Sequence, residues 1–122
     1  FPYNICAQPF DADAQPVTPP YIVNTCTEGN QGRPCVTSDG SDRFLILWDC
    51  HDPSGDGCCV RSQLCTGAGG LVDCESALHV EGARRNWYPG AAMAPDGRYV
   101  VVWIAEPPDG QGYDVFAQTG AM

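Results

Sequence analysis

"RYVVVWIAEPPDGQGYDVFAQ", residues 98–118, decides how the chain is interpreted, because the same sequence holds a second copy of it. The stretch contains an apolar run, a turn rich in Gly, Pro and Asp, and a second strand-like run. "RFLILWDCHDPSGDGCCVRSQ", residues 43–63, matches it without a gap. Arg43 falls on Arg98 and Trp48 on Trp103, which sets a period of 55 residues. A repeat of this kind determines the architecture before local propensities do.

Each period contains four strand-like stretches separated by turn residues. A partial third copy, "YNICAQ" at residues 3–8, aligns with residues 58–63 and 113–118. We therefore expect an all-β chain of antiparallel, four-stranded, blade-like repeats of 55 residues. Residues 1–33 are expected to supply the last strands of one blade, residues 34–80 a complete blade, and residues 81–122 a second blade that lacks its last strand.

The strongest strand is apolar on both faces. Successive side chains of a strand point to opposite sides, so Phe44 and Ile46 share one face with Trp48, while Leu45 and Leu47 share the other. A strand covered on both faces is typical of stacked sheets, and four short strands per 40 to 55 residues favour a β-propeller-like arrangement among them. Trp48 and the equivalent Trp103 are expected to fill the core.

The stretch "APDGRYVVVWIAEPPDGQGYDVFAQ", residues 94–118, resembles a bacterial extracellular repeat family. In that family, segments of the types "DGxFVVVW", "DGxGxGV" and "xxQ" are iterated, and "IVNT", residues 22–25, is similar to the strand that precedes each repeat. The resemblance implies β-propeller-like blades and an extracellular setting. It implies no particular activity, because propellers host many. The first full copy departs from the pattern, with "SDGSDR" in place of "PDGR".

Composition and charge exclude several classes of partner. The chain has 14 Gly and 11 Pro, a formal net charge of -9, and no lysine. Nucleic acids and anionic membrane surfaces require a basic face, so neither is expected as a partner. The longest apolar run, "YVVVWIA" at residues 99–105, is the length of a strand and too short for a membrane span. The chain begins at Phe1 without Met, so we expect a processed protein or an excised piece.

Eight cysteines in 122 residues predict disulfide staples and an oxidising, extracellular or cell-surface location. The spacing matches neither zinc knuckles nor a haem attachment motif. Structural bonding is expected in preference to a redox role for Cys58 and Cys59. The connectivity stays open, and the expected pairs are Cys26 with Cys35, Cys65 with Cys74, Cys50 with Cys58 or Cys59, and Cys6 with the remaining cysteine in the same chain or another.

An acidic turn is the candidate metal site. Asp49, Asp52 and Asp56 carry the hard oxygen ligands that calcium accepts, although their spacing is not that of an EF-hand loop. Asp and Gly also form tight turns without an ion. Calcium is the one cofactor that the sequence suggests, and the alternative is a turn with no cofactor.

A basic and aromatic loop is the candidate ligand site. Arg84, Arg85, Trp87 and Tyr88 lie together in an otherwise acidic chain. Aromatic rings beside guanidinium groups can stack on a sugar or hold an acidic partner. The alternative is that Trp87 packs between blades while both arginines remain solvated.

No catalytic motif is present. The two histidines, His51 and His79, do not occupy equivalent repeat positions, and GxSxG, HExxH and phosphate-loop motifs are absent. We expect a non-enzymatic structural module whose incomplete blades pair edge to edge between copies, in a filament or ring. The alternatives are a lectin-like or protein-binding propeller module and a piece of a longer repeat array.

Overall fold

The computed structural model describes residues 3–51, 58–78, 83, 85–107 and 109–121, without the side chains of Cys58 and Cys74. These residues form strands and no helix, which confirms the all-β prediction. In particular, they include no helix with the length and apolarity needed to cross a membrane. The strands are β1 Cys6–Ala7, β2 Tyr21–Ile22, β3 Asn30–Ser38, β4 Arg43–His51, β5 Cys58–Thr66, β6 Leu71–Leu78, β7 Arg85–Met93, β8 Arg98–Glu106 and β9 Asp114–Ala121.

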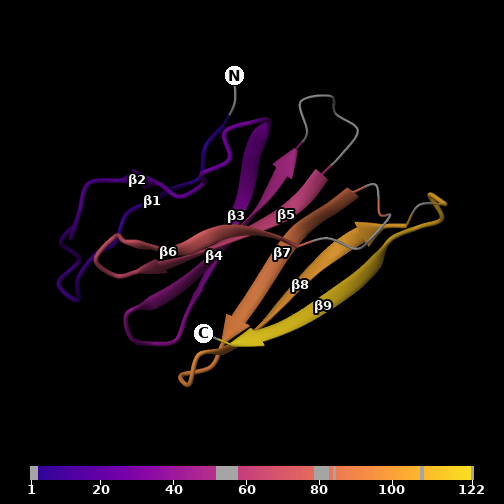
Figure 1. Cartoon of the computed structure of the whole chain (residues 1–122). Coiled ribbons are helices and arrows are strands. Elements are labelled where there is room, and N and C mark those ends of the chain that lie inside the picture. The colour runs from indigo at the N-terminus through magenta and orange to yellow at the C-terminus, as the bar shows by residue number, and fades with distance from the viewer. Residues whose placement is uncertain (1–2, 52–57, 79–82, 84, 108, 122) are drawn as a thin grey trace.

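The strands form three groups that follow the chain (Figure 1). β1 and β2 pair in a segment that we call the N-terminal layer, residues 3–29. β3 to β6 form an antiparallel first meander, and β7 to β9 an antiparallel second meander. One parallel pair, Cys58 with Arg85, joins the two meanders at their ends. The described strands form no closed propeller.

The 55-residue period appears in the strand bounds themselves. β3 and β7 begin and end at equivalent positions, and so do β4 and β8. β3 starts at Asn30, ahead of Pro34, and accommodates the proline in a bulge between Gly32 and Cys35. β7 has the same bulge between Trp87 and Gly90. The equivalent bulge residues Arg33 and Tyr88 both have positive φ angles, of 48° and 54°.

Each meander holds its tryptophan by the same hydrogen bond. The indole Nε1 of Trp48 donates to Oε1 of Gln31 at 2.8 Å, and that of Trp103 donates to Oδ1 of Asn86 at 3.1 Å. Both bonds are buried and run from the second strand of a meander to the first. A buried indole N–H needs a hydrogen-bond partner. The two amides supply it, so each tryptophan fills its core without leaving a donor unpaired.

The first meander is covered on both sides, which confirms the expectation from its apolar strand. Leu45, Leu47 and Val60 pack against the second meander in a shared cluster with Val101, Trp103 and Ala105. On the other side, Ile46, Trp48 and Cys65 pack against Ile5 and Val23 of the N-terminal layer. Figure 1 shows the first meander between these two neighbours.

Replacing Trp103 by Ala should lower the free energy of unfolding by about 3 to 5 kcal/mol, because a core cavity is left and Asn86 loses its donor. Trp103 is only 4% exposed. Urea denaturation followed by circular dichroism measures the change. Tyr3→Ala is the matched control, since Tyr3 is 71% exposed and its loss should be nearly neutral. An unchanged unfolding transition for Trp103→Ala would contradict the placement of this indole in the core.

Candidate functional site

The outward face of the second meander is exposed where the equivalent face of the first is buried. Val100, Val102 and Val115 are 36%, 38% and 73% exposed. The first meander has Leu45, Leu47 and Val60 at these positions, with exposed fractions of 3%, 0% and 0% under the second meander. An apolar sheet face of this kind is typical of an interaction surface.

The outer edge of β9 is open on the same side of the molecule. β9 pairs with β8 along its length, and no described strand pairs with its other edge. Gln118 of β9 is the third member of a repeated series. Gln63 of β5 donates from Nε2 to the backbone oxygens of Val72 and Asp73 in β6, at 2.9 and 3.1 Å.

Gln8, at the end of the first partial repeat, makes the equivalent hydrogen bond. Its Nε2 donates to the backbone oxygen of Thr18, which occupies the position of Asp73 one period earlier, at 3.1 Å. Gln63 thus holds the start of the fourth strand, β6, and Gln8 holds the chain just before β2. Gln118 is exposed, and no described residue makes a hydrogen bond to its side chain. We call this edge, together with Val100, Val102 and Val115, the open side.

The N-terminal layer carries exposed apolar side chains of its own. Its strand β2 lies beside β1, with Tyr21 opposite Ala7 and Ile22 opposite Cys6. "IVNT" therefore completes the N-terminal unit here and does not lie beside β9 of its own chain. The layer leaves four large apolar side chains exposed by half or more: Tyr3, Phe10, Val17 and Ile22.

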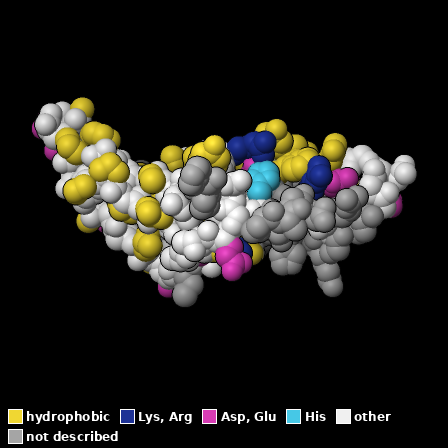
Figure 2. Space-filling view, turned by 90° about the horizontal axis from the view of Figure 1, so that it is seen from above, with side chains coloured by type: hydrophobic (Ala, Val, Ile, Leu, Met, Phe, Trp, Pro, Cys, Tyr) yellow, Lys and Arg dark blue, Asp and Glu magenta, His cyan; other side chains and the backbone are white. Residues whose placement is uncertain are grey.

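Part of the predicted basic and aromatic loop gathers on one face of the molecule. The guanidinium of Arg85 lies 5.4 Å from the ring of Trp87, and the Trp87 ring lies 5.6 Å from that of Tyr113. Tyr88 meets the other side of this group and stacks under Arg33 at 4.4 Å. We call these five residues the arginine–aromatic patch. Figure 2 shows arginine and histidine side chains beside hydrophobic ones on the face seen from above.

Sequence reasoning placed Arg85, Trp87 and Tyr88 in this patch and missed Arg33 and Tyr113. Arg33 was findable, because it is the repeat equivalent of Tyr88. Arg84 lies outside the described residues. The patch adjoins the open side, since Trp87 is the ladder partner of Ile104 on the outward face.

Asp49, one of the three predicted calcium ligands, ties the two meanders together. Its side chain is fully buried, and Oδ2 pairs with Nη1 of Arg33 at 2.8 Å. Oδ1 accepts the backbone N–H of Tyr88, in the second meander, at 2.9 Å. Burial raises the pKa of Asp49, and the contacts with Arg33 and Tyr88 oppose that shift.

The metal prediction concerns residues that the structure covers only in part. Asp52 and Asp56 lie outside the described residues. Among those described, no three His, Cys, Asp or Glu side chains gather in a way that could hold a metal ion. The carboxylate of Asp49 is committed to Arg33 and Tyr88, so its role in this structure is to join the meanders.

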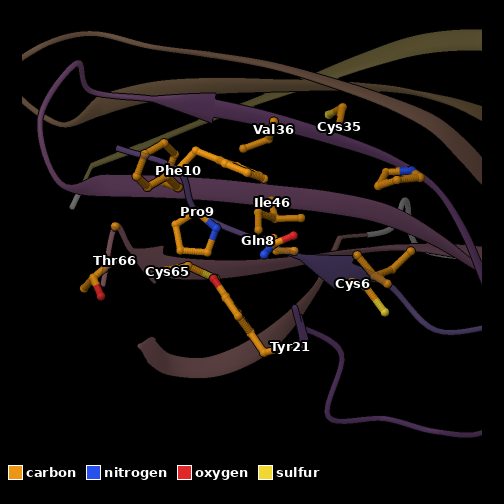
Figure 3. A pocket seen from close by; sticks show the side chains of 15 residues that line it. Cys6, Gln8, Pro9, Phe10, Tyr21, Cys35, Val36, Ile46, Cys65 and Thr66 are labelled. Carbon is orange, nitrogen blue, oxygen red and sulfur yellow. The ribbon is translucent and has the colours of Figure 1, made fainter. Parts of the chain in front are cut away.

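A pocket of about 440 Å³ lies between the N-terminal layer and the first meander (Figure 3). Phe10, Val36 and Ile46 are among its mainly apolar lining residues. The hydroxyl of Tyr21 points toward Cys65, and burial raises the pKa of both groups. No sequence pattern marked this pocket, because its two walls come from segments that only folding brings together.

Six of the eight cysteines have described side chains, and no two of these sulfur atoms are bonded. Cys50 lies directly opposite Cys59 in the β4–β5 ladder. Cys26 lies near Arg61 and Glu75 on the face covered by the N-terminal layer, whereas Cys35 packs against the opposite face. A bond between Cys26 and Cys35 would therefore require this part of the chain to rearrange. Cys65 lies opposite Leu71 of β6, and Cys6 is exposed on β1.

Comparisons with protein-family models, with curated proteins and with solved structures found no match to this chain.

Asp49→Ala should lower the free energy of unfolding by about 2 to 3 kcal/mol, because it orphans the Tyr88 N–H and leaves a void between the meanders. Asp49→Asn should stay within about 1 kcal/mol of the wild type at pH 7, since the amide still accepts that N–H and no buried charge remains. Urea denaturation of the three proteins measures both changes. An alanine variant as stable as the asparagine variant would contradict the claim that the Asp49 side chain joins the two meanders.

The same pair of proteins tests the pKa of Asp49. Because that pKa is raised above 3.8, the folded wild type binds more protons than the unfolded chain as the pH rises from about 4 through the folded value. Stability contributed by Asp49 is therefore greatest at low pH and is lost over this range. Wild type should gain stability relative to Asp49→Asn as the pH is lowered. A constant difference between the two proteins from pH 7 to pH 4 would contradict the raised pKa.

Proposed function

We propose that this chain is a non-enzymatic, extracellular structural module that assembles with further copies of itself through the open side. In this proposal it belongs to a β-propeller-like repeat family and is stapled by disulfides. The cysteine content and the resemblance of its repeats support the extracellular setting. The observation that carries the proposal is the exposure of Val100, Val102 and Val115 at positions that the first meander buries.

The first meander indicates what should cover the exposed face of the second, because the two meanders are copies of one repeat. Inside the chain, the same three positions of the first meander are covered by the next unit along the sequence. The order of packing is N-terminal layer, first meander, second meander. A second copy continues this order when its N-terminal layer, with Tyr3 and Ile22 exposed, packs on the open side. The contact is head to tail, so repeated addition gives a ring or a filament.

The edge strands of the sheet also favour the open side as the place where another copy binds. β3, one of the two edge strands of the first meander, has Pro34 and a bulge, and both features block pairing with another strand. β9 has no proline, and its one charged residue, Asp114, is at its start. Gln118 is in position to donate to a backbone carbonyl of an incoming strand, as Gln8 and Gln63 do within the chain. Compared with β3, β9 is therefore the less protected edge.

Val115→Asp should convert the assembled protein to monomers, because a carboxylate at the centre of an apolar contact has no partner there. Mass photometry and light scattering over a range of concentrations measure particle mass against the 13.1 kDa of one chain. Val36→Asp is the matched control, since Val36 is 63% exposed on β3, away from the open side. It should assemble like the wild type, whereas Gln118→Ala should weaken assembly. A wild type that is monomeric at every concentration, or a Val115→Asp variant that still assembles, overturns the proposal.

The arginine–aromatic patch supports a second candidate function, the binding of a glycan. Tyr88 and Tyr113 are 55% and 60% exposed, and with Trp87 they present adjacent rings that apolar sugar faces can stack on. Arg33 and Arg85 lie against two of these rings. A lectin-like module would bind as a single species with a saturable isotherm, whereas the assembly module would form particles of increasing mass.

Trp87→Ala should weaken glycan binding at least about fivefold, because one stacked ring contributes on the order of 1 kcal/mol or more. A glycan array identifies a binding oligosaccharide, and isothermal titration calorimetry then gives the affinity. Tyr3→Ala removes an exposed ring outside the patch and should leave the affinity unchanged. An array without a binding glycan, or equal affinities for both variants, contradicts this second candidate.

A further inference from the structure

The β4–β5 ladder brings two cysteines together at a site that the sequence left open. Cys50 pairs with Cys59, and Cys58 pairs with His51. Directly opposed residues of antiparallel strands have Cα atoms about 4.5 to 5.5 Å apart. This spacing falls within the range of about 4.4 to 6.8 Å that disulfides span. The two backbones therefore need no rearrangement to be joined.

The surroundings hold the sulfur of Cys50 in place. Cys50 is buried, and its Sγ accepts a hydrogen bond from Nε2 of Gln31 at 3.4 Å. The same Gln31 side chain accepts the indole N–H of Trp48 and donates to the backbone oxygen of Glu28. Cys50 thus belongs to the network that fixes the tryptophan of the first meander. A thiol held in this way keeps little conformational freedom, so forming a bond costs little further entropy.

The thiol of Cys59 faces that of Cys50. The two residues are directly opposed in the ladder, so their side chains lie on the same face of the sheet. Burial raises the pKa of Cys59, and the neighbouring Cys50 raises it further. The guanidinium of Arg61 lies beside Cys59 and opposes this shift. A nearby positive charge stabilises the thiolate that attacks in thiol–disulfide exchange.

We propose that Cys50 and Cys59 form an intramolecular disulfide that clamps β4 to β5 beside Asp49, the residue that joins the two meanders. The bond depends on the proposed extracellular setting only for its oxidant, which is a low-molecular-weight disulfide such as oxidised glutathione. The Cys59 thiolate attacks one sulfur of the oxidant, and one thiolate leaves. The Cys50 thiolate then attacks Cys59 of the mixed disulfide, and a second thiolate leaves. Two protein thiols are oxidised, one disulfide is reduced to two thiols, and the protons end on the released thiols.

Of the four other described cysteines, Cys26 is the nearest competitor, because it and Cys59 both interact with Arg61. The other three compete poorly for either partner. Cys35 lies opposite Leu47 on the other face of the meander. Cys65 lies opposite Phe44, six ladder positions from the Cys50–Cys59 pair, and its thiol meets Tyr21 there. Cys6 lies opposite Ile22 in the N-terminal layer. Among the described side chains, Cys50 and Cys59 are the one pair that the strand register opposes.

The test is disulfide mapping of the full chain. The reduced, folded protein is incubated with oxidised glutathione, free thiols are alkylated, and non-reduced peptides are identified by mass spectrometry. The expected first product links Cys50 to Cys59, and it is absent from Cys59→Ser but present in the matched control Cys65→Ser. Protein in which Cys50 is bonded to Cys58 or another cysteine, or remains alkylated as a free thiol, overturns the proposal.

A second readout separates this inference from the assembly function. Oxidation should raise the urea midpoint of the wild type and of the non-assembling Val115→Asp variant alike, because the clamp acts within one chain. It should raise the midpoint of Cys59→Ser less than that of the wild type, because this variant keeps its other cysteines but cannot form the clamp. A midpoint that rises equally in Cys59→Ser would assign the effect to another bond and contradict the clamp. Failure of assembly leaves this result intact, so the two proposals fail independently.

Discussion

A strand that is apolar on both faces has to be covered on both faces, and this constraint organises the molecule. β4 alternates Phe44, Ile46 and Trp48 on one face with Leu45 and Leu47 on the other. The N-terminal layer covers the first face and the second meander covers the second. Each covering unit buries apolar surface, which stabilises the fold by roughly 25 cal/mol per Å² buried. Because β8 repeats the pattern of β4, the second meander has the same need and meets it on one face alone.

Within this stack, polar groups determine which arrangement forms. The Trp48–Gln31 and Trp103–Asn86 hydrogen bonds give both indoles one orientation. Asp49 joins the bulge of β3 to the bulge of β7, by a side-chain contact with Arg33 and a backbone contact with Tyr88. A buried carboxylate is costly unless it is paired, so the meanders are stable in a register that supplies both partners.

Much of the fold was predictable because the repeat carries it. The hairpins and the two-faced burial of β4 follow from a 55-residue offset and from alternation, whereas β3 begins at Asn30, ahead of the residue 34 at which the blade was expected to start. The candidate site was predictable only in part. Trp87 and Tyr88 stood out as an aromatic pair, whereas Tyr113 joins them through the packing of a loop that carries no such signal. Asp49 was interpreted as a calcium ligand in an acidic turn, because sequence alone does not show that Arg33 lies beside it.

By itself, the sequence determined the class of structure, the repeated strands and the tryptophans in their core. These properties depend on residues close together in the chain or one period apart, so pattern and spacing reveal them. The tertiary structure alone decided which cysteine faces Cys50, which carboxylate is buried and which apolar face remains exposed. A shift of one residue in strand register exchanges the two faces of a strand, and only the packed ladder specifies that register. The open side is likewise a result of tertiary packing. Val102 and Leu47 have equivalent sequence positions, but only Leu47 is covered by another unit.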